Sequence, residues 1–220
     1  MHDCPNTPNG AMDSRAELLN AEPSANASWD EDDRLAALIG YCILDTPAET
    51  SFDDLVELAV DLCAVSSAAI HFVADTRLWC KAAAGGPRGT SQPRDGSLCA
   101  RAILQTDPLV IEDLSQEPEA AASGRSGFYA AAVLRTPEGL PLGTFCLFDD
   151  QPRQLTARQL QHLQALARQA TAALELRRTR HIDERNRQII DSAVDYAILT
   201  CSPQGEITSW NEGAQRILGW

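Results

Sequence analysis

Cysteine offers the most reactive chemistry in this sequence, because a thiolate can be a nucleophile, a redox partner or a metal ligand. Seven cysteines are spread along the 220 residues: Cys4, Cys42, Cys63, Cys80, Cys99, Cys146 and Cys201. Their number is odd and none forms a C-x-x-C pair, while the four histidines, His2, His71, His162 and His181, are equally scattered. This spacing predicts neither a disulfide framework nor a zinc site. The alternating strand around Cys146 predicts a core position for that residue.

The charge balance limits the partners that this chain can have. It carries 18 basic and 31 acidic residues, a formal charge of −13. An acidic surface cannot neutralise nucleic-acid phosphates or bind an anionic membrane electrostatically. No apolar run is long enough to span a bilayer, and the first residues lack the basic and apolar regions of a signal peptide. With unpaired cysteines, these features predict a cytoplasmic protein that binds neither nucleic acid nor membrane.

Elements that could position reactive side chains begin at residue 32. Residues 1–31 are rich in acids, Pro, Ser and Asn, and are expected to form a disordered tail. The apolar periodicity then predicts two helices, ending near Gly40 and Cys63. Strands are expected over residues 67–75, 77–85 and 108–113, a short helix over 97–105, and a hairpin over 128–150. The sequence therefore predicts an α+β fold with an antiparallel sheet flanked by helices.

A long helix is expected from Thr156, which forms a T-x-x-Q capping box with Gln159. Apolar residues then recur at alternating spacings of three and four, namely Leu160, Leu163, Ala167, Ala170 and Leu174. This seam predicts a homodimer in which the helices over residues 156–187 lie side by side, although packing on the helix's own domain is the alternative. The charged residues 179–187 are expected to form a helical linker.

Several segments in this order resemble a GAF domain of the type found in bacterial sensor proteins. They are YCILDTPAETSFDDLVELA, DTRLWCKAAAG, SLCARAI, PLVIEDL and FYAAAVLRTPEGLPLGTFCLFDD, and the resemblance covers residues 32–178. Residues 188–220, through IIDSAVDYAILTCSPQGEITSWNEGAQRILGW, resemble the N-terminal part of a PAS domain and are expected to be truncated. GAF followed by PAS implies a non-catalytic input module, expected here in a sensor histidine kinase of a two-component system, with a diguanylate cyclase as the alternative.

The resemblance also implies a ligand cavity between the sheet and the short helix. Its predicted ligand-binding residues are Trp79, Cys99, Arg101, Asp113 and Tyr129, with Cys80 and Phe128 beside them. Arg101 would favour an anionic group, but this position is usually His in the family, and Cys80 stands where an aromatic residue is usual. In the alternative reading, the cavity is filled and Arg101 pairs with Asp113. No catalytic or metal-binding residues are predicted, and the small-molecule ligand is unknown.

Two further hypotheses use a cysteine. Photoreceptor GAF domains attach a bilin to a cysteine close to a histidine, but Cys99 is followed by Ala100 and Arg101, so a bilin is not expected. A reductase of free methionine sulfoxide needs a thiolate of low pKa and a resolving partner, and Cys80 and Cys99 are the candidates. We therefore keep a GAF-type thiol enzyme as the alternative to a sensory module.

Overall fold

The computed structural model describes residues 29–118, 120 and 126–219. The tail predicted for residues 1–31 therefore lies almost entirely outside the described residues. Helix α1 (Glu31–Gly40) begins one residue before the expected boundary, where the carboxylate of Asp30 accepts hydrogen bonds from the backbone N–H groups of Asp32 and Asp33. This capping fixes the start of α1.

A six-stranded antiparallel sheet forms the centre of the domain, in the order β3-β2-β1-β6-β5-β4. The strands are β1 (Ser67–Val73), β2 (Arg77–Ala84), β3 (Ser91–Pro93), β4 (Leu109–Ile111), β5 (Phe128–Arg135) and β6 (Pro141–Asp149). The predicted α+β fold with an antiparallel sheet is confirmed. The short β3 lies outside the strands that the sequence predicted.

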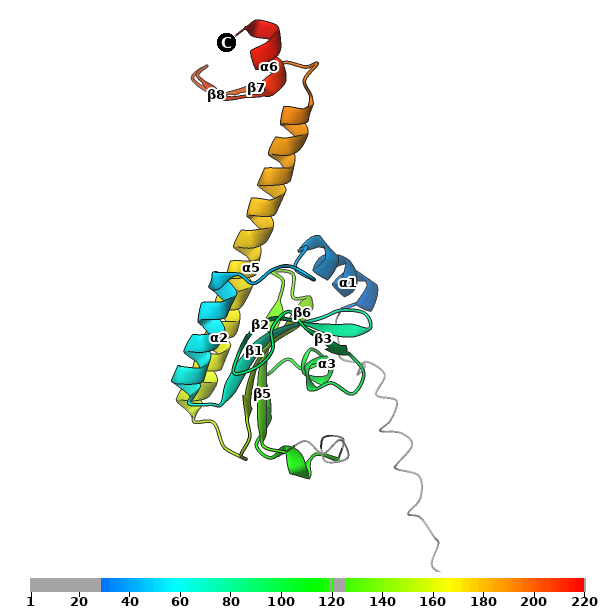
Figure 1. Ribbon diagram of the computed structural model, residues 1–220, viewed down its shortest axis with the longest axis vertical. Helices are drawn as coiled ribbons and strands as arrows, with labels where there is room; N and C mark the ends of the chain where they lie inside the picture. Colours follow the sequence, from blue (N-terminus) through cyan, green and yellow to red (C-terminus); the bar gives the residue numbers. More distant parts are fainter. Residues whose placement is uncertain (1–28, 119, 121–125, 220) are drawn as a thin grey trace, which may run out of the picture.

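Helices cover the two faces of this sheet unequally (Figure 1). On one face α2 (Thr50–Cys63) and α5 (Ala157–Ser192) lie side by side over a large apolar core. On the other face α3 (Leu98–Ala102) and the 3-10 turn η1 (Leu114–Gln116) cover a smaller core. Because side chains alternate along a strand, β1, β2, β5 and β6 each contribute to both cores.

The apolar seam of α5 is used within its own domain. The capping box predicted at Thr156 and Gln159 is present, and Leu163, Ala167, Ala170 and Leu174 are buried in the core shared with α2. The seam therefore supplies no surface for a second chain, because the same heptad-like spacing also suits a helix lying on a sheet. The helix then continues past the expected linker boundary at residue 187 to Ser192.

A sharp junction joins α5 to a small C-terminal unit, which consists of β7 (Leu199–Cys201), β8 (Ile207–Trp210) and α6 (Glu212–Leu218). Asn211 is buried at this junction, where its amide Nδ2 donates to the carbonyl oxygens of Ile190, Ala193 and Tyr196. Its Oδ1 accepts from the N–H groups of Ile198 and Ala214, so it is also the N-cap of α6, as predicted. One side chain thus ties the end of α5 to both following elements.

Lys81 is buried at a bulge in β2. Ile70 pairs with Ala82 and His71 with Cys80, which leaves Lys81 as the extra residue of the strand. Its ammonium donates to Thr46 Oγ1 (2.8 Å), the Pro47 carbonyl (2.6 Å) and Glu49 Oε1 (2.6 Å). The same Glu49 oxygen accepts from Nε of Arg177 on α5 at 2.9 Å. Glu49 therefore links the sheet to the long helix.

Candidate functional site

A cavity of about 340 Å³ lies on the α3 face of the sheet. Its wall is formed by side chains from the sheet, α3, η1 and the neighbouring loops: His71, Leu78, Gln92, Ser97, Leu98, Cys99, Leu114, Ser126, Phe128, Tyr129, Phe148, Asp149 and Asp150. This volume is within the range of small-molecule sites, which combine an apolar wall with a few polar groups.

Thiols, an imidazole and a phenol meet at the inner end of this cavity. Cys99 Sγ lies 3.7 Å from Cys146 Sγ. The Tyr129 hydroxyl is 3.5 Å from the first sulfur and 3.4 Å from the second, and Thr144 Oγ1 is 3.1 Å from Cys146 Sγ. The ligand atoms of His71, Cys99 and Cys146 all lie within 4.8 Å of one another, and all three residues are buried.

Strand register explains why residues far apart in sequence meet here. His71 on β1 pairs with Cys80 of β2 on one side and with Thr144 of β6 on the other. Cys146 on β6 pairs with Ala69 of β1 and Ala131 of β5. Paired residues of neighbouring strands point to the same face of the sheet. Ser97 caps α3 by accepting from the N–H of Ala100, and this short helix places Cys99 against that face.

The buried groups of this cluster change one another's pKa values. Burial lowers the pKa of His71, but hydrogen bonds with Cys80 and Cys99 and their charge outweigh it and raise the pKa to about 10. The hydrogen bond from Cys146, helped by His71, holds the pKa of Cys99 well below its usual value. Burial raises the pKa of Cys146 and of Tyr129 far above the usual range. Of the two thiols, Cys99 is therefore the one that loses its proton more readily.

Two of the five residues predicted for the ligand site, Cys99 and Tyr129, lie in the wall of this cavity. Trp79 lies in the larger core beneath α2 and α5, called the helix-side core below, because alternation along β2 points its side chain away from α3. Its ring is 5.7 Å from the Arg77 guanidinium carbon. Phe128 lines the cavity as well, while Cys80 is buried on β2 outside the lining.

Arg101 and Asp113 do not form the pair that the sequence suggested. Arg101 Nη1 donates to Glu117 Oε2 at 2.7 Å. Asp113 caps η1, where its carboxylate accepts hydrogen bonds from the backbone N–H and hydroxyl of Ser115 and from the Gln116 amide. The hydrogen bonds from the Ser115 and Gln116 side chains are the main causes that lower the pKa of Asp113. Neither residue lines the cavity. The Asp113 carboxylate accepts hydrogen bonds within its own 3-10 turn, and the Arg101 guanidinium contacts Glu117.

His71, Thr144 and Cys146 were not among the residues predicted for the ligand site. The available signal was the polar His71 in an otherwise apolar strand, SAAIHFV. Nothing in the spacing of the cysteines and histidines revealed that β1 and β6 would be neighbours, because their pairing is non-local.

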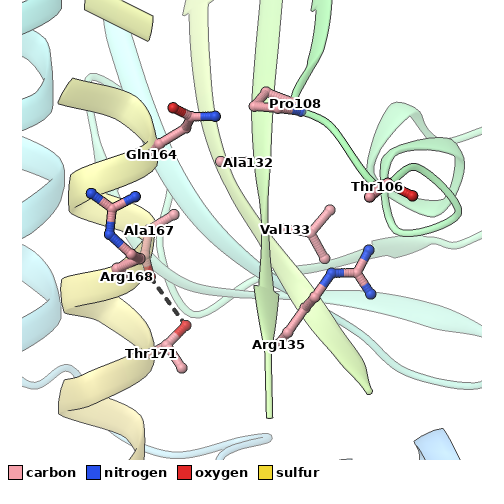
Figure 2. Close-up of a pocket in the computed structure, with 9 residues that line it drawn as sticks. All are labelled: Thr106, Pro108, Ala132, Val133, Arg135, Gln164, Ala167, Arg168 and Thr171. Carbon is pink, nitrogen blue, oxygen red and sulfur yellow. Dashed lines mark hydrogen bonds between the residues drawn. The ribbon is translucent and has the colours of Figure 1, made fainter. Parts of the chain in front are cut away.

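A second cavity, of about 400 Å³, lies between α5 and β5 (Figure 2). Its lining includes Arg135 and Arg168, and the Arg135 guanidinium already donates to the carbonyl oxygens of Gln105 and Gly139. Thr171 likewise donates its hydroxyl to the Ala167 carbonyl within α5. Since the cluster of titratable and nucleophilic groups lies at the α3-face cavity, we take that cavity as the candidate site.

Residues 45–175 match the family model described as "GAF domain", which is more than half of the chain. The chain belongs to the GAF domain family. Its members are sensory domains of signalling proteins, so the fold and the family part of the resemblance are confirmed. Among the described residues of this GAF domain chain, no helix has the length and apolar character needed to cross a membrane.

This GAF domain chain is similar to several known proteins. It is 33% identical over 164 residues to a cyclic di-GMP phosphodiesterase of Pseudomonas aeruginosa, a match that covers 70% of this chain and 28% of that protein. The chain thus spans little more than a quarter of that relative's length.

Two solved structures share the fold. The GAF domain of an Acinetobacter phosphoenolpyruvate-protein phosphotransferase superposes with a TM-score of 0.50 at 15% identity, covering 65% of this chain and 91% of that one. The chromophore-binding domain of an R. palustris bacteriophytochrome superposes with a TM-score of 0.50 at 12% identity, covering 67% of this chain and 63% of that one. At these identities the likeness shows the fold alone.

Proposed function

We propose that this chain is a cytoplasmic sensory input module that binds a small molecule in the α3-face cavity and reports it through α5. A sensor histidine kinase of a two-component system is the proposed host, with residues 188–220 as the start of a PAS domain. The observation that carries the proposal is the double use of α5, whose first half is part of the domain core while its second half leaves the domain.

Contacts between the two sheet faces support such a relay. His71 lines the cavity, and its cross-strand neighbour Cys80 directly precedes Lys81, which bonds to Glu49 on the opposite side. Glu49 in turn accepts from Arg177 near the point where α5 leaves the core. A ligand that prefers one arrangement of β1 and β2 would therefore bias the position of α5.

Native mass spectrometry of the full chain, as purified, tests this function. We expect a retained small molecule, and hydrogen exchange in residues 175–192 should become faster when it is removed. The Y129F variant should retain less of it, because the cavity loses its phenolic hydroxyl, whereas Y196F changes an exposed tyrosine and serves as the matched control. The proposal fails if no mass is retained and no nucleotide, haem, bilin or small anion raises the melting temperature.

Two other functions have specific support. The phosphodiesterase relative favours an input region of a cyclic di-GMP enzyme, such as a diguanylate cyclase, as the second candidate host. The 3.7 Å separation of the Cys99 and Cys146 sulfurs favours a thiol reductase of free methionine sulfoxide, in which two thiols become a disulfide while the sulfoxide becomes a thioether and water. The test is turnover of free methionine sulfoxide in the presence of a disulfide reductant. If the wild type shows this activity and the C99S variant loses it, the reductase function replaces the sensory proposal.

We also propose a homodimer, formed through the part of α5 beyond the core. Ile182 and Ile189 lie seven residues apart and are exposed, as a helix–helix contact with a second copy requires. Light scattering should give a dimer at tens of micromolar for the wild-type chain and a monomer for the I182E/I189E variant. The L58E variant, which alters an exposed leucine on α2, should remain dimeric, and a wild-type monomer would contradict the proposal.

A further inference from the structure

The cluster of His71, Cys99 and Cys146 has the composition of a metal site. One residue comes from β1, one from α3 and one from β6, so the sheet and the docked helix fix their relative positions. Imidazole nitrogen and thiolate sulfur suit zinc and copper, whereas calcium and magnesium need oxygen ligands. This site could not be predicted from sequence motifs, because its three residues are far apart along the chain and match no zinc-motif spacing.

The sulfur separation matches a shared tetrahedral ion. Two thiolates that bind one zinc ion at about 2.3 Å, at the tetrahedral angle, lie about 3.8 Å apart. The observed distance between Cys99 Sγ and Cys146 Sγ is 3.7 Å. A disulfide would require these atoms to approach to about 2.05 Å.

His71 supplies a second, independent observation. The residue is only 7% exposed, and its Nδ1 has no hydrogen-bond partner in the described part of the chain. Buried polar atoms are nearly always satisfied, so the unpartnered Nδ1 needs an explanation. An imidazole nitrogen of His71 lies within 4.8 Å of both sulfurs, and a metal ion bound by the ring would supply that explanation.

Charge and surroundings agree with a divalent ion. Zinc with two thiolates and a neutral imidazole has no net charge, which suits a buried site. The hydroxyls of Tyr129 and Thr144 lie within hydrogen-bond distance of the sulfurs and would orient them from the outer shell. His71 and Cys99 also line the cavity, so a fourth position can be reached from it.

We propose that His71, Cys99 and Cys146 bind one Zn²⁺ ion, whose fourth position is open to water or a small ligand in the cavity. Three protein ligands and one exchangeable position are typical of zinc that interacts with a substrate or ligand. The proposal concerns binding alone and holds whether or not the module has the sensory function proposed above.

Zinc titration of the full chain, reduced and freed of metal by a chelator, tests the site. We expect one zinc per chain by elemental analysis, and X-ray absorption of the zinc-loaded wild type should show two sulfur neighbours and an imidazole. This spectrum needs no substitution, so it remains decisive if variants fold poorly.

Variants then assign the ligands. C99S and C146S should each weaken zinc binding by at least about 100-fold. C63S is the matched control, because Cys63 is buried in the helix-side core, and it should bind zinc like the wild type. Less than stoichiometric zinc in the wild type, only nitrogen and oxygen neighbours in the spectrum, or zinc retained by the C99S/C146S double variant would each overturn the proposal.

Discussion

The G143A variant should be largely unable to fold. Gly143 lies on β6, where it pairs with Phe72 of β1, and an added Cβ would lie 2.1 Å from the His71 carbonyl oxygen and 2.9 Å from the Phe72 Cα. These are backbone atoms of a central strand, so no side chain can move aside. We expect a loss of about 4 kcal/mol or more in the free energy of unfolding, comparable to the total stability of a typical domain.

Urea unfolding followed by circular dichroism measures this effect. G40A is the matched control, because Gly40 ends α1 at a position where a new Cβ meets nothing within 4 Å, and its free energy of unfolding should stay within about 1 kcal/mol of wild type. If G143A unfolds at the wild-type urea concentration, the close approach of β1 and β6 described above is wrong.

Replacing Lys81 with methionine should give the second-largest loss. Methionine keeps most of the stem, but Thr46, Pro47 and Glu49 lose the donor that they share. Because the ammonium is buried and the Glu49 side chain is about one-third exposed, we expect the free energy of unfolding to fall by about 2–3 kcal/mol. R88M is the control, since its ion pair with Asp53 involves an exposed guanidinium and should contribute less than about 1 kcal/mol.

The K81M effect should depend on pH. Burial alone would raise the pKa of Glu49, but hydrogen bonds from Lys81 and Arg177 outweigh it and lower the pKa below its ordinary value of 4.5. A carboxyl with a lowered pKa stabilises the fold above its unfolded value, and this contribution is lost as the pH falls through the folded value. The difference between wild type and K81M should therefore be full at neutral pH and shrink below pH 4.5. A difference that does not change with pH would remove Glu49 from the explanation.

Local pattern was sufficient for most elements of this fold. Alternation, turn chemistry and capping account for β1, β2, β4, β5 and β6, for the hairpin predicted over residues 128–150 and for the Thr156 capping box. Which residues of α1 would be buried was less predictable from the sequence. Ile39 is exposed, while Arg34 is buried and its Nη1 donates to the Val73 carbonyl at 2.6 Å. A guanidinium can take a core position only where backbone carbonyls face it, which depends on tertiary structure.

The candidate site was less predictable than the fold, for the same reason. Alternation indicates which face of a strand a residue occupies, but it does not indicate which strands are neighbours, and the cluster of His71, Cys99 and Cys146 depends on β1 pairing with β6. The bulge at Lys81 also places its two neighbours, Cys80 and Ala82, on opposite faces of the sheet, whereas strict alternation would put both on one face. The apolar seam predicted on α5 is buried, but its spacing does not indicate whether a sheet or a second helix covers it.

The junction at Asn211 has a mechanical consequence. From Arg177, whose side chain still bonds to Glu49 and Tyr41, to Ser192 the helix rises about 22 Å with no residue buried in the domain core. A tilt of about 5° at the sheet would therefore move its far end by about 2 Å, as a lever does. A loose hinge at residue 193 would absorb that displacement. Because Asn211 bonds to both sides of the joint, the displacement is instead delivered to the hairpin and α6 as the movement of a single body.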